Sequence, residues 1–250
     1  MKGKLVHSCN EVMKQSSHSS RGSSPKVIAA IPCWNTDPFI EDIVSRARKY
    51  VGQVVVIDDG SCDGTAEAAR RAGALVMVHD QNRGYGETIK SCFAAARRND
   101  ADVLAILDGD GQHSPEDIPG VLAPMLQGEA DLTIGSRFLN DGIDMPRYRK
   151  FGIKVITFLF NFGSRTRVSD AQSGFRGYHR RVFSDLVLAE KGMSISIETL
   201  EKARRRGAVI KEVPVHCRYA PSTLNPKAIR HGFGVALAVI KIRLLNMFGD

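Results

Sequence analysis

Short apolar runs alternate with helix-like segments through the first half of the chain. Four runs of four or five residues are expected to form strands: Val27–Ile31, Val54–Ile57, Leu75–Val78 and Val103–Leu107. Three intervening segments have helical spacing or are rich in helix-forming residues: Pro38–Tyr50, Thr65–Ala72 and Glu87–Arg98. Strands that alternate with helices in this way form right-handed crossovers, so the pattern predicts an α/β fold with a mainly parallel sheet.

A polar or glycine-rich cluster follows each of these four strands. The clusters are Pro32–Asn35, Asp58–Ser61, Asn82–Gly86 and Asp108–Gln112. Because ligands of open parallel sheets bind beyond the carboxyl ends of the strands, the clusters are expected to gather along one edge of the sheet. The sequence therefore predicts a binding site built from four separate loops.

The second half of the chain has a less regular pattern. Asp131–Ile134 and a segment near Val209–Val215 are expected to form strands, whereas Arg147–Phe162 and Ile195–Arg206 are expected to form helices. Residues between these elements carry no clear periodicity, and the sequence shows no internal repeat.

The two ends of the chain differ from its centre. Residues 1–25 are polar and rich in serine, so we expect a flexible tail before a domain that spans residues 26–220. Residues 221–250 contain the apolar segment Phe233–Phe248, which a lysine and an arginine interrupt. This composition suits an amphipathic helix in a membrane interface, although a terminal helix packed on the domain would show it as well. No segment reaches the ~20 uninterrupted apolar residues that a membrane span requires.

Positive charge is concentrated in the second half of the chain. The 250 residues carry 35 Lys and Arg against 27 Asp and Glu, a formal net charge of +8. Residues 1–136 have a balance of −4, whereas residues 137–250 have a balance of +12. The second half is therefore expected either to face an anionic partner, such as phosphate or a lipid surface, or to carry a solvated basic helix face.

The motif Asp108-Gly109-Asp110 is the sharpest chemical signal. Its two carboxylates lie two residues apart where a buried strand enters a loop, so both can point at one ligand. Gln112 offers a third oxygen two residues further on. Hard oxygen donors of this kind suit Mg²⁺ or Mn²⁺, which would bridge phosphate oxygens. The sequence thus predicts a divalent metal held by Asp108, Asp110 and Gln112.

The same acidic motif leaves a second enzyme class open. A phosphatase of the haloacid dehalogenase type also places two aspartates after an apolar strand and uses the first, here Asp108, as its nucleophile. In that class the motif usually follows an early strand, whereas three predicted strands precede this one. A nicotinamide-dependent oxidoreductase is disfavoured, because Gly84-Tyr85-Gly86 lacks the third glycine of the dinucleotide fingerprint. Nucleic-acid binding is not expected, since no basic segment is interleaved with aromatic recognition residues.

Six motifs in order carry a resemblance to a known family. They are Ile31–Asn35, Val56–Thr65, Asn82–Gly86, Leu107–Gln112, Gly135–Arg137 and Asp170–Arg176. Together they resemble glycosyltransferase family 2, and within it the polyprenyl-phosphate (dolichyl-phosphate) sugar transferases. The resemblance implies a GT-A fold, a Rossmann-like single domain with C-terminal interfacial helices. It also implies a metal-dependent, inverting transfer of a hexose from a UDP- or GDP-linked sugar to a polyprenyl phosphate, or to a glycan or soluble acceptor.

The resemblance further implies a nucleotide-sugar site at the predicted edge. Six residues would line the donor: Pro32, Trp34, Asp58, Asn82, Gly84 and Asp108. The three predicted metal ligands would hold the metal on the diphosphate of this donor. Family members often carry an acid directly after the asparagine of the first motif, whereas this chain has Thr36, so the resemblance does not specify the base.

For the acceptor, the resemblance implies four residues around the lipid phosphate: Arg137, Arg149, Gln172 and Ser173. The catalytic residues would be Asp110, Arg137 and Asp170, with Asp170 orienting the acceptor rather than acting as an obligatory base. Because the acceptor phosphate is already ionised at neutral pH, catalysis reduces to orienting this nucleophile and neutralising the departing diphosphate. Arg176 is a weaker candidate for phosphate contact and would otherwise be a surface cation.

The expected location is the inner face of a membrane. Basic residues of Arg147–Lys154 and the C-terminal segment would attract the protein to lipid headgroups. The five cysteines are scattered and form no CxxC pair, which fits a reducing cytoplasmic compartment. We therefore expect a peripheral cytoplasmic enzyme whose partners are a nucleotide-sugar, a polyprenyl phosphate and a membrane surface.

Overall fold

The predicted alternation of strands and helices is confirmed in the first half of the chain. The computed structural model describes residues 24–140, 145–164 and 166–219. The strands of this part are β1 (Val27–Cys33), β2 (Gln53–Asp58), β3 (Leu75–Val78), β4 (Val103–Ile106), β5 (Leu132–Ser136), β6 (Arg176–His179) and β7 (Ile210–Pro214). The α-helices are α2 (Asp37–Ala47), α3 (Thr65–Arg71), α4 (Tyr85–Arg98), α5 (Ile118–Leu126), α6 (Arg147–Asn161), α7 (Arg180–Phe183) and α8 (Ile195–Arg205).

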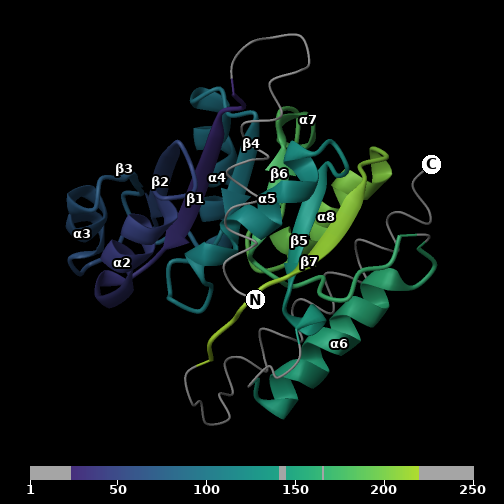
Figure 1. Cartoon of the computed structure of the whole chain (residues 1–250). Helices are drawn as coiled ribbons and strands as arrows, with labels where there is room; N and C mark the ends of the chain where they lie inside the picture. Colours follow the sequence, from purple (N-terminus) through teal and green to yellow (C-terminus); the bar gives the residue numbers. More distant parts are fainter. Residues whose placement is uncertain (1–23, 141–144, 165, 220–250) are drawn as a thin grey trace, which may run out of the picture.

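All of these strands join one sheet in the order β3-β2-β1-β4-β6-β5-β7 (Figure 1). Strand β6 runs antiparallel to both of its neighbours, whereas the other pairs are parallel. Strands β1 and β4 are adjacent but connect to elements on opposite sides, so the strand order reverses there, the position at which open α/β sheets bind ligands. The mainly parallel sheet with flanking helices is therefore confirmed, with one antiparallel strand that the sequence pattern does not predict.

Strand β1 continues through Pro32, where the sequence pattern predicts its end. Pro32 pairs with Ile57 of β2, whereas the β4 ladder stops at Ala30, opposite Ile106. A proline lacks the N–H that a strand flanked on both sides would need. Because β1 has a regular ladder partner on only one side at this position, the strand tolerates Pro32 and runs on to Cys33.

Two elements form against their local sequence signals. Helix α5 contains Pro119, Gly120 and Pro124, yet Val121 and Leu122 are buried against the sheet. Strand β6 reads Arg-Gly-Tyr-His and has no apolar run, but it lies between β4 and β5 and is paired on both sides. In both cases the tertiary partner supplies the stabilisation that local propensity lacks.

Helices cover both faces of the sheet, and each face has its own apolar core. On one face α2, α3 and α5 contribute residues such as Ile43, Ala69 and Leu122. On the other face α4, α6 and α8 contribute residues such as Phe93 and Phe160. Burial of apolar surface stabilises a fold by ~25 cal/mol per Å². These two layers therefore hold the strand ends in place and position the loops that follow them.

Several expectations fall on residues that the structure does not describe. The serine-rich tail before residue 24 and the apolar segment Phe233–Phe248 lie outside the described residues. The domain boundaries proposed from the sequence therefore stay predictions. Within the described residues, no helix combines the length and the apolar character that crossing a bilayer requires.

Candidate functional site

The four predicted loops meet at one edge of the sheet. The backbone N–H of Gly109, after β4, donates to the Pro32 carbonyl of β1 at 3.1 Å. Asp58 closes the β1–β2 pairing opposite Cys33, and the N–H of Asp59 donates to the Cys33 carbonyl at 2.9 Å. The expected gathering of the loops is thus present in the folded chain.

Asp108 lies at the base of this edge, beside β6. A β-carbon placed on Gly174 would come within 2.5 Å of its Oδ2, so only glycine leaves room for the carboxylate there. The Tyr85 hydroxyl lies 3.5 Å from its Oδ1. Burial raises the pKa of Asp108 to about 6, although the charges of Arg137 and Arg176 act in the opposite direction. A carboxylate in this setting gains from any cation that approaches it.

Asp110 lies further out in the same loop and is exposed. Its Oδ1 accepts the N–H of Gln112 at 3.0 Å, and its Oδ2 accepts a hydrogen bond from the Gln112 side-chain amide. Partial loss of hydration and the neighbouring Asp108 charge both raise the pKa of Asp110. The loop therefore holds two negative groups close enough to oppose each other's ionisation.

The predicted metal ligands fit a divalent cation. Mg²⁺ and Mn²⁺ prefer carboxylate and amide oxygens, and Mg²⁺ often takes one or two protein carboxylates and completes its shell with water and substrate phosphates. Asp108 and Asp110 provide the carboxylates, and the Gln112 side chain adds an amide beside them. Across the described residues, no group of three or more His, Cys, Asp and Glu could hold a metal by itself. The arrangement thus suits a cation shared with a phosphate ligand.

His113, which the sequence analysis did not single out, packs under this loop and contacts its backbone. It is buried against Phe175, and its Nδ1 accepts the backbone N–H of Asp108 at 3.3 Å. Burial lowers the pKa of His113 to about 4, so the ring is neutral at pH 7. His113 thus positions Asp108 without neutralising it.

The two aspartates that follow β2, Asp58 and Asp59, have different hydrogen-bond partners. The Asp58 carboxylate is buried and accepts the N–H of Ser61 at 3.0 Å as well as the Ser61 hydroxyl. The Asp59 carboxylate accepts the N–H groups of Arg83 at 2.9 Å and Gly84 at 2.8 Å. Asp59, missed by the sequence analysis, therefore ties the end of β2 to the Asn82–Gly86 loop.

The Asp59 site is completed by a histidine. Nδ1 of His79 lies 2.7 Å from Asp59 Oδ1. Burial opposes ionisation of Asp59, but these hydrogen bonds outweigh it and lower the pKa of the carboxyl below its usual value. Gly84 takes a φ of 89°, a left-handed conformation that glycine adopts without strain. The loop before α4 is therefore held by a preformed polar anchor.

The remaining donor residues lie around this anchor. Trp34 directly follows β1 and is 55% exposed, so its ring is free to stack on a planar ligand. Asn82 is exposed, and its backbone packs against Gly60 of the second motif. The structure thus brings Pro32, Trp34, Asp58, Asn82 and Gly84 to one edge, although the Asp58 carboxylate faces its own loop.

Arg137 and Asp170 form a buried ion pair on the acceptor side. Arg137 follows β5, and its Nε and Nη2 donate to the two Asp170 oxygens at 2.6 and 2.8 Å. Burial disfavours the Arg137 charge, but the Asp170 carboxylate more than compensates and raises its pKa. Such two-pronged pairing fixes the guanidinium plane as well as its position.

Residues 215–219 link this ion pair to the candidate metal loop, Asp108–Gln112. Nη1 of Arg137 donates to the Tyr219 hydroxyl at 3.0 Å, and the Arg149 guanidinium lies 5.9 Å from the centre of the Tyr219 ring. Further back, the N–H of Arg218 donates to the Gln112 carbonyl at 2.9 Å. The Asp108–Gln112 loop and the Arg137–Asp170 pair are therefore adjacent, which the sequence alone does not reveal.

The other acceptor-side residues differ in their accessibility. Gln172 is partly exposed, whereas the Ser173 hydroxyl is buried and donates to the Gly135 carbonyl at 2.6 Å. Ser173 thus serves the loop rather than a ligand. Glu212 of β7, another residue that the sequence analysis missed, accepts the N–H groups of Ser169 and Asp170 at 2.7 and 3.1 Å.

The chain is similar to proteins that are named as sugar transferases or synthases. A UDP-N-acetylglucosamine–dolichyl-phosphate N-acetylglucosaminyltransferase from Methanococcus voltae is 26% identical over 86% of this chain and 94% of its own. A polyprenol monophosphomannose synthase from Mycolicibacterium smegmatis is 30% identical, with 76% of each chain covered. Glucosyl-3-phosphoglycerate synthase from Mycobacterium tuberculosis, solved with Mn²⁺, UDP and phosphoglyceric acid, superposes with a TM-score of 0.74 at 18% identity, covering 93% of this chain and 81% of that chain.

The likeness to that solved structure confirms the expected GT-A fold. The model of the family described as "Glycosyl transferase family 2" matches residues 28–187, which include the donor loops, Arg137 and Asp170. This match leaves the phosphatase alternative without support. The chain belongs to glycosyl transferase family 2 and is a glycosyltransferase.

Proposed function

We propose that the protein transfers a hexose from a nucleotide-sugar to a polyprenyl phosphate. The observation that carries the proposal is the juxtaposition of two unpaired carboxylates, Asp108 and Asp110, with the preformed Arg137–Asp170 pair, joined by residues 215–219. One half suits a metal-bound diphosphate, and the other suits a second phosphate. The relative that acts on dolichyl phosphate supports the choice of acceptor.

On the donor side, Asp108, Asp110 and Gln112 would hold Mg²⁺ or Mn²⁺. When bound, such a cation neutralises the charge that develops on a departing diphosphate. Solved relatives of the same fold contain Mn²⁺ or Mg²⁺ together with UDP, which supports this use of the loop. Trp34 would cover the nucleoside, with Asn82 and Gly84 at its edge.

On the acceptor side, Arg137 keeps donors for a phosphate despite its ion pair. A guanidinium has five N–H groups, and the Asp170 and Tyr219 bonds use three of them. Arg149 adds a second cation, because its guanidinium contacts the ring face of Tyr219 and not a carboxylate that would neutralise it. The two arginines would orient an ionised phosphate oxygen for attack on the sugar carbon opposite the leaving group, which inverts that centre.

No general base is required for this reaction. A phosphate monoester is already largely ionised at pH 7, so its oxygen attacks without losing a proton. Asp170 would therefore act as a positioning group, because its carboxylate is buried and both oxygens contact Arg137. Positioning and charge neutralisation are each able to lower a barrier by several kcal/mol.

Helix α6 supports a peripheral position on the inner face of a membrane. Phe151 and Phe158 of the helix and Phe162 at its C-cap are 70%, 65% and 72% exposed, and their spacing places them along one side. The exposed cations Lys150 and Lys154 accompany these side chains. Apolar side chains flanked by lysines are typical of helices that lie in a lipid interface. Arg149 of the same helix would bring a membrane-borne phosphate to Arg137.

The proposal is tested by a transfer assay with two panels. Purified protein is incubated with Mg²⁺ or Mn²⁺, UDP- and GDP-linked hexoses, and either a polyprenyl phosphate or soluble phosphorylated and glycan acceptors. We expect a lipid-linked monosaccharide whose anomeric configuration is opposite to that of the donor, identified by linkage analysis. Transfer to soluble or glycan acceptors alone would replace the polyprenyl phosphate by the alternative acceptor class.

A further inference from the structure

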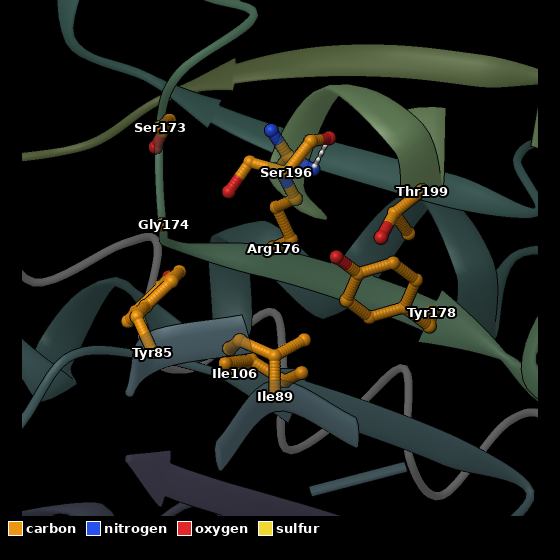
Figure 2. Close-up of a pocket in the computed structure, with 9 residues that line it drawn as sticks. All are labelled: Tyr85, Ile89, Ile106, Ser173, Gly174, Arg176, Tyr178, Ser196 and Thr199. Carbon is orange, nitrogen blue, oxygen red and sulfur yellow. Dashed lines mark hydrogen bonds between the residues drawn. The ribbon is translucent and has the colours of Figure 1, made fainter. Parts of the chain in front are cut away.

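Arg176 is a buried cation that the proposed mechanism does not use. It lies on β6, and its side chain rises toward α8 (Figure 2). The side chain is among the largest fully buried ones of the described residues, so the expectation of a surface cation is wrong. Nη1 donates to the Ser196 carbonyl at 2.7 Å, and Nη2 donates to the Ala171 carbonyl at 2.8 Å.

This guanidinium lacks the partner that a buried charge normally has. Within the described residues, Arg176 forms no ion pair with an Asp or Glu, and its Nε has no hydrogen-bond acceptor. Its side chain also contacts the Tyr178 hydroxyl, and the Asp108 carboxylate acts on it only as a nearby charge. A buried cation held by neutral groups is costly, and an unused donor adds to that cost. Such a group is expected where a ligand supplies the missing acceptor.

Arg176 lines a small cleft that could receive such an acceptor. The walls carry hydroxyl groups from Tyr85, Ser173, Tyr178, Ser196 and Thr199, and Ile89 and Ile106 form an apolar floor (Figure 2). The cleft has room for one group the size of a water molecule rather than for a whole sugar ring. Its chemistry therefore suits one polar substituent of a larger ligand.

The cleft adjoins the candidate metal loop. Its lining residue Gly174 lies against the Asp108 carboxylate, and the hydroxyl of Tyr85 lies 3.5 Å from the same group. On the sheet, Arg176 pairs with Ile106, two residues before Asp108. A sugar attached to a diphosphate at Asp108 would therefore have this cleft within reach.

We propose that the cleft binds one oxygen substituent of the transferred sugar, a hydroxyl or an amide carbonyl, and that Arg176 Nε donates a hydrogen bond to it. Arg176 is then a specificity-determining residue of the donor site. The inference rests on the proposed function, because that function brings a nucleotide-sugar to Asp108. A second phosphate is a poorer occupant, since the cleft admits only one water-sized group.

The test separates the sugar from the rest of the donor by calorimetry. Dissociation constants are measured with Mn²⁺ for UDP, GDP and their glucose, mannose and N-acetylglucosamine conjugates. The sugar contribution is the ratio of the constant for the free diphosphate to that for its tightest conjugate. In Arg176→Met we expect this ratio to fall roughly 10-fold, the effect of losing a charged hydrogen-bond donor, while diphosphate binding stays within about twofold of wild type.

Monodeoxy analogues of that conjugate identify the substituent. Wild type should bind one analogue roughly 10-fold more weakly than the parent, whereas Arg176→Met should bind the two equally. Arg180→Met is the matched control, because Arg180 is an exposed arginine that pairs with Asp100 away from the cleft. Thr199→Val, which removes a wall hydroxyl and retains the side-chain shape, is the second cleft variant, and it carries the test alone if Arg176→Met does not fold.

Three results would overturn the inference. Equal loss of diphosphate and conjugate binding in both cleft variants would make Arg176 a purely structural residue. Unchanged sugar ratios in both variants would mean that the cleft holds only water. Failure of wild type to bind any nucleoside diphosphate would instead remove the proposed function and this inference with it. This third result is distinguishable from the first two, because both of those require that wild type binds the diphosphate.

Discussion

Charge is arranged in opposite ways in the two halves of the candidate site. In the donor half, Asp108 and Asp110 lie close together, and within the described residues neither has a Lys or Arg at ion-pair distance. In the acceptor half, Arg137 is paired through two hydrogen bonds with Asp170 and shielded from solvent. The donor carboxylates are thus offset only by the more distant charges of Arg137 and Arg176, whereas the acceptor half compensates its charge through a direct ion pair.

The difference agrees with the ligands that we propose for each half. Neighbouring carboxylates raise each other's pKa and are stabilised when a divalent cation arrives, so the donor loop is suited to a metal that comes with its substrate. An arginine held by a buried carboxylate keeps one orientation and still has free N–H groups. The acceptor half is therefore suited to positioning an anion rather than to attracting it from a distance.

The largest effect should come from removing one donor carboxylate. We expect Asp110→Asn to lower metal-dependent transfer roughly 100- to 1000-fold, because the loop loses half of its charge. The free energy of unfolding should change by less than about 1 kcal/mol, since Asp110 is exposed. Transfer assays and Mn²⁺ titration measure the loss, with Asp80→Asn as the exposed-carboxylate control. Full activity of Asp110→Asn would remove that residue from the site.

On the acceptor side the first effect should be on stability. Arg137→Ala leaves the Asp170 carboxylate buried without its cation, which costs about 3–5 kcal/mol. The double variant Arg137→Ala/Asp170→Ala should recover part of that loss, because no buried charge is left unpaired. Urea unfolding measures both values. A single variant as stable as wild type would show that the pair is dispensable for folding.

Arg149 offers a cleaner probe of acceptor binding, because its contact with Tyr219 is only a ring contact. Arg149→Ala should raise the acceptor KM about 10-fold and leave the donor KM unchanged, with a loss of stability below about 1 kcal/mol. Steady-state kinetics with a short-chain polyprenyl phosphate measure the two constants. Lys150→Ala removes an adjacent exposed charge and should change neither; an equal rise in the donor KM would assign Arg149 to the other half.

The last prediction concerns stability alone, at Asp59, a donor-side carboxylate whose hydrogen bonds are complete. Asp59→Asn should cost about 1–3 kcal/mol, because amide N–H groups of Arg83 and Gly84 lose an ionised acceptor. The pKa of Asp59 is lowered in the folded protein, so its stabilisation is present above pH ~4 and is lost as the pH falls through the lowered value. A plot of the free energy of unfolding against pH, between pH 3 and 7, should therefore be flatter for the variant than for wild type. Parallel plots would contradict this role.

Local signals were sufficient for the donor half. The first four strands and the helices between them follow apolar runs and helical spacing, and the loops after the strands meet at one edge as predicted. Even so, sequence could not separate Asp58 from Asp59, because which of two adjacent carboxylates faces the next loop depends on how the loops pack. Here Asp59 holds Gly84, and Asp58 binds within its own loop.

The sequence by itself determined the parallel half of the sheet, the acidic loop after β4 and the family, because each depends on short motifs that can be recognised one by one along the chain. Only the tertiary structure decided that β6 inserts antiparallel, that Arg137 pairs with a carboxylate 33 residues away, and that Arg176 is buried beside the metal loop. Strand insertion and charge pairing at such separations depend on which distant segments pack together in the folded chain. No local pattern of residues predicts those contacts.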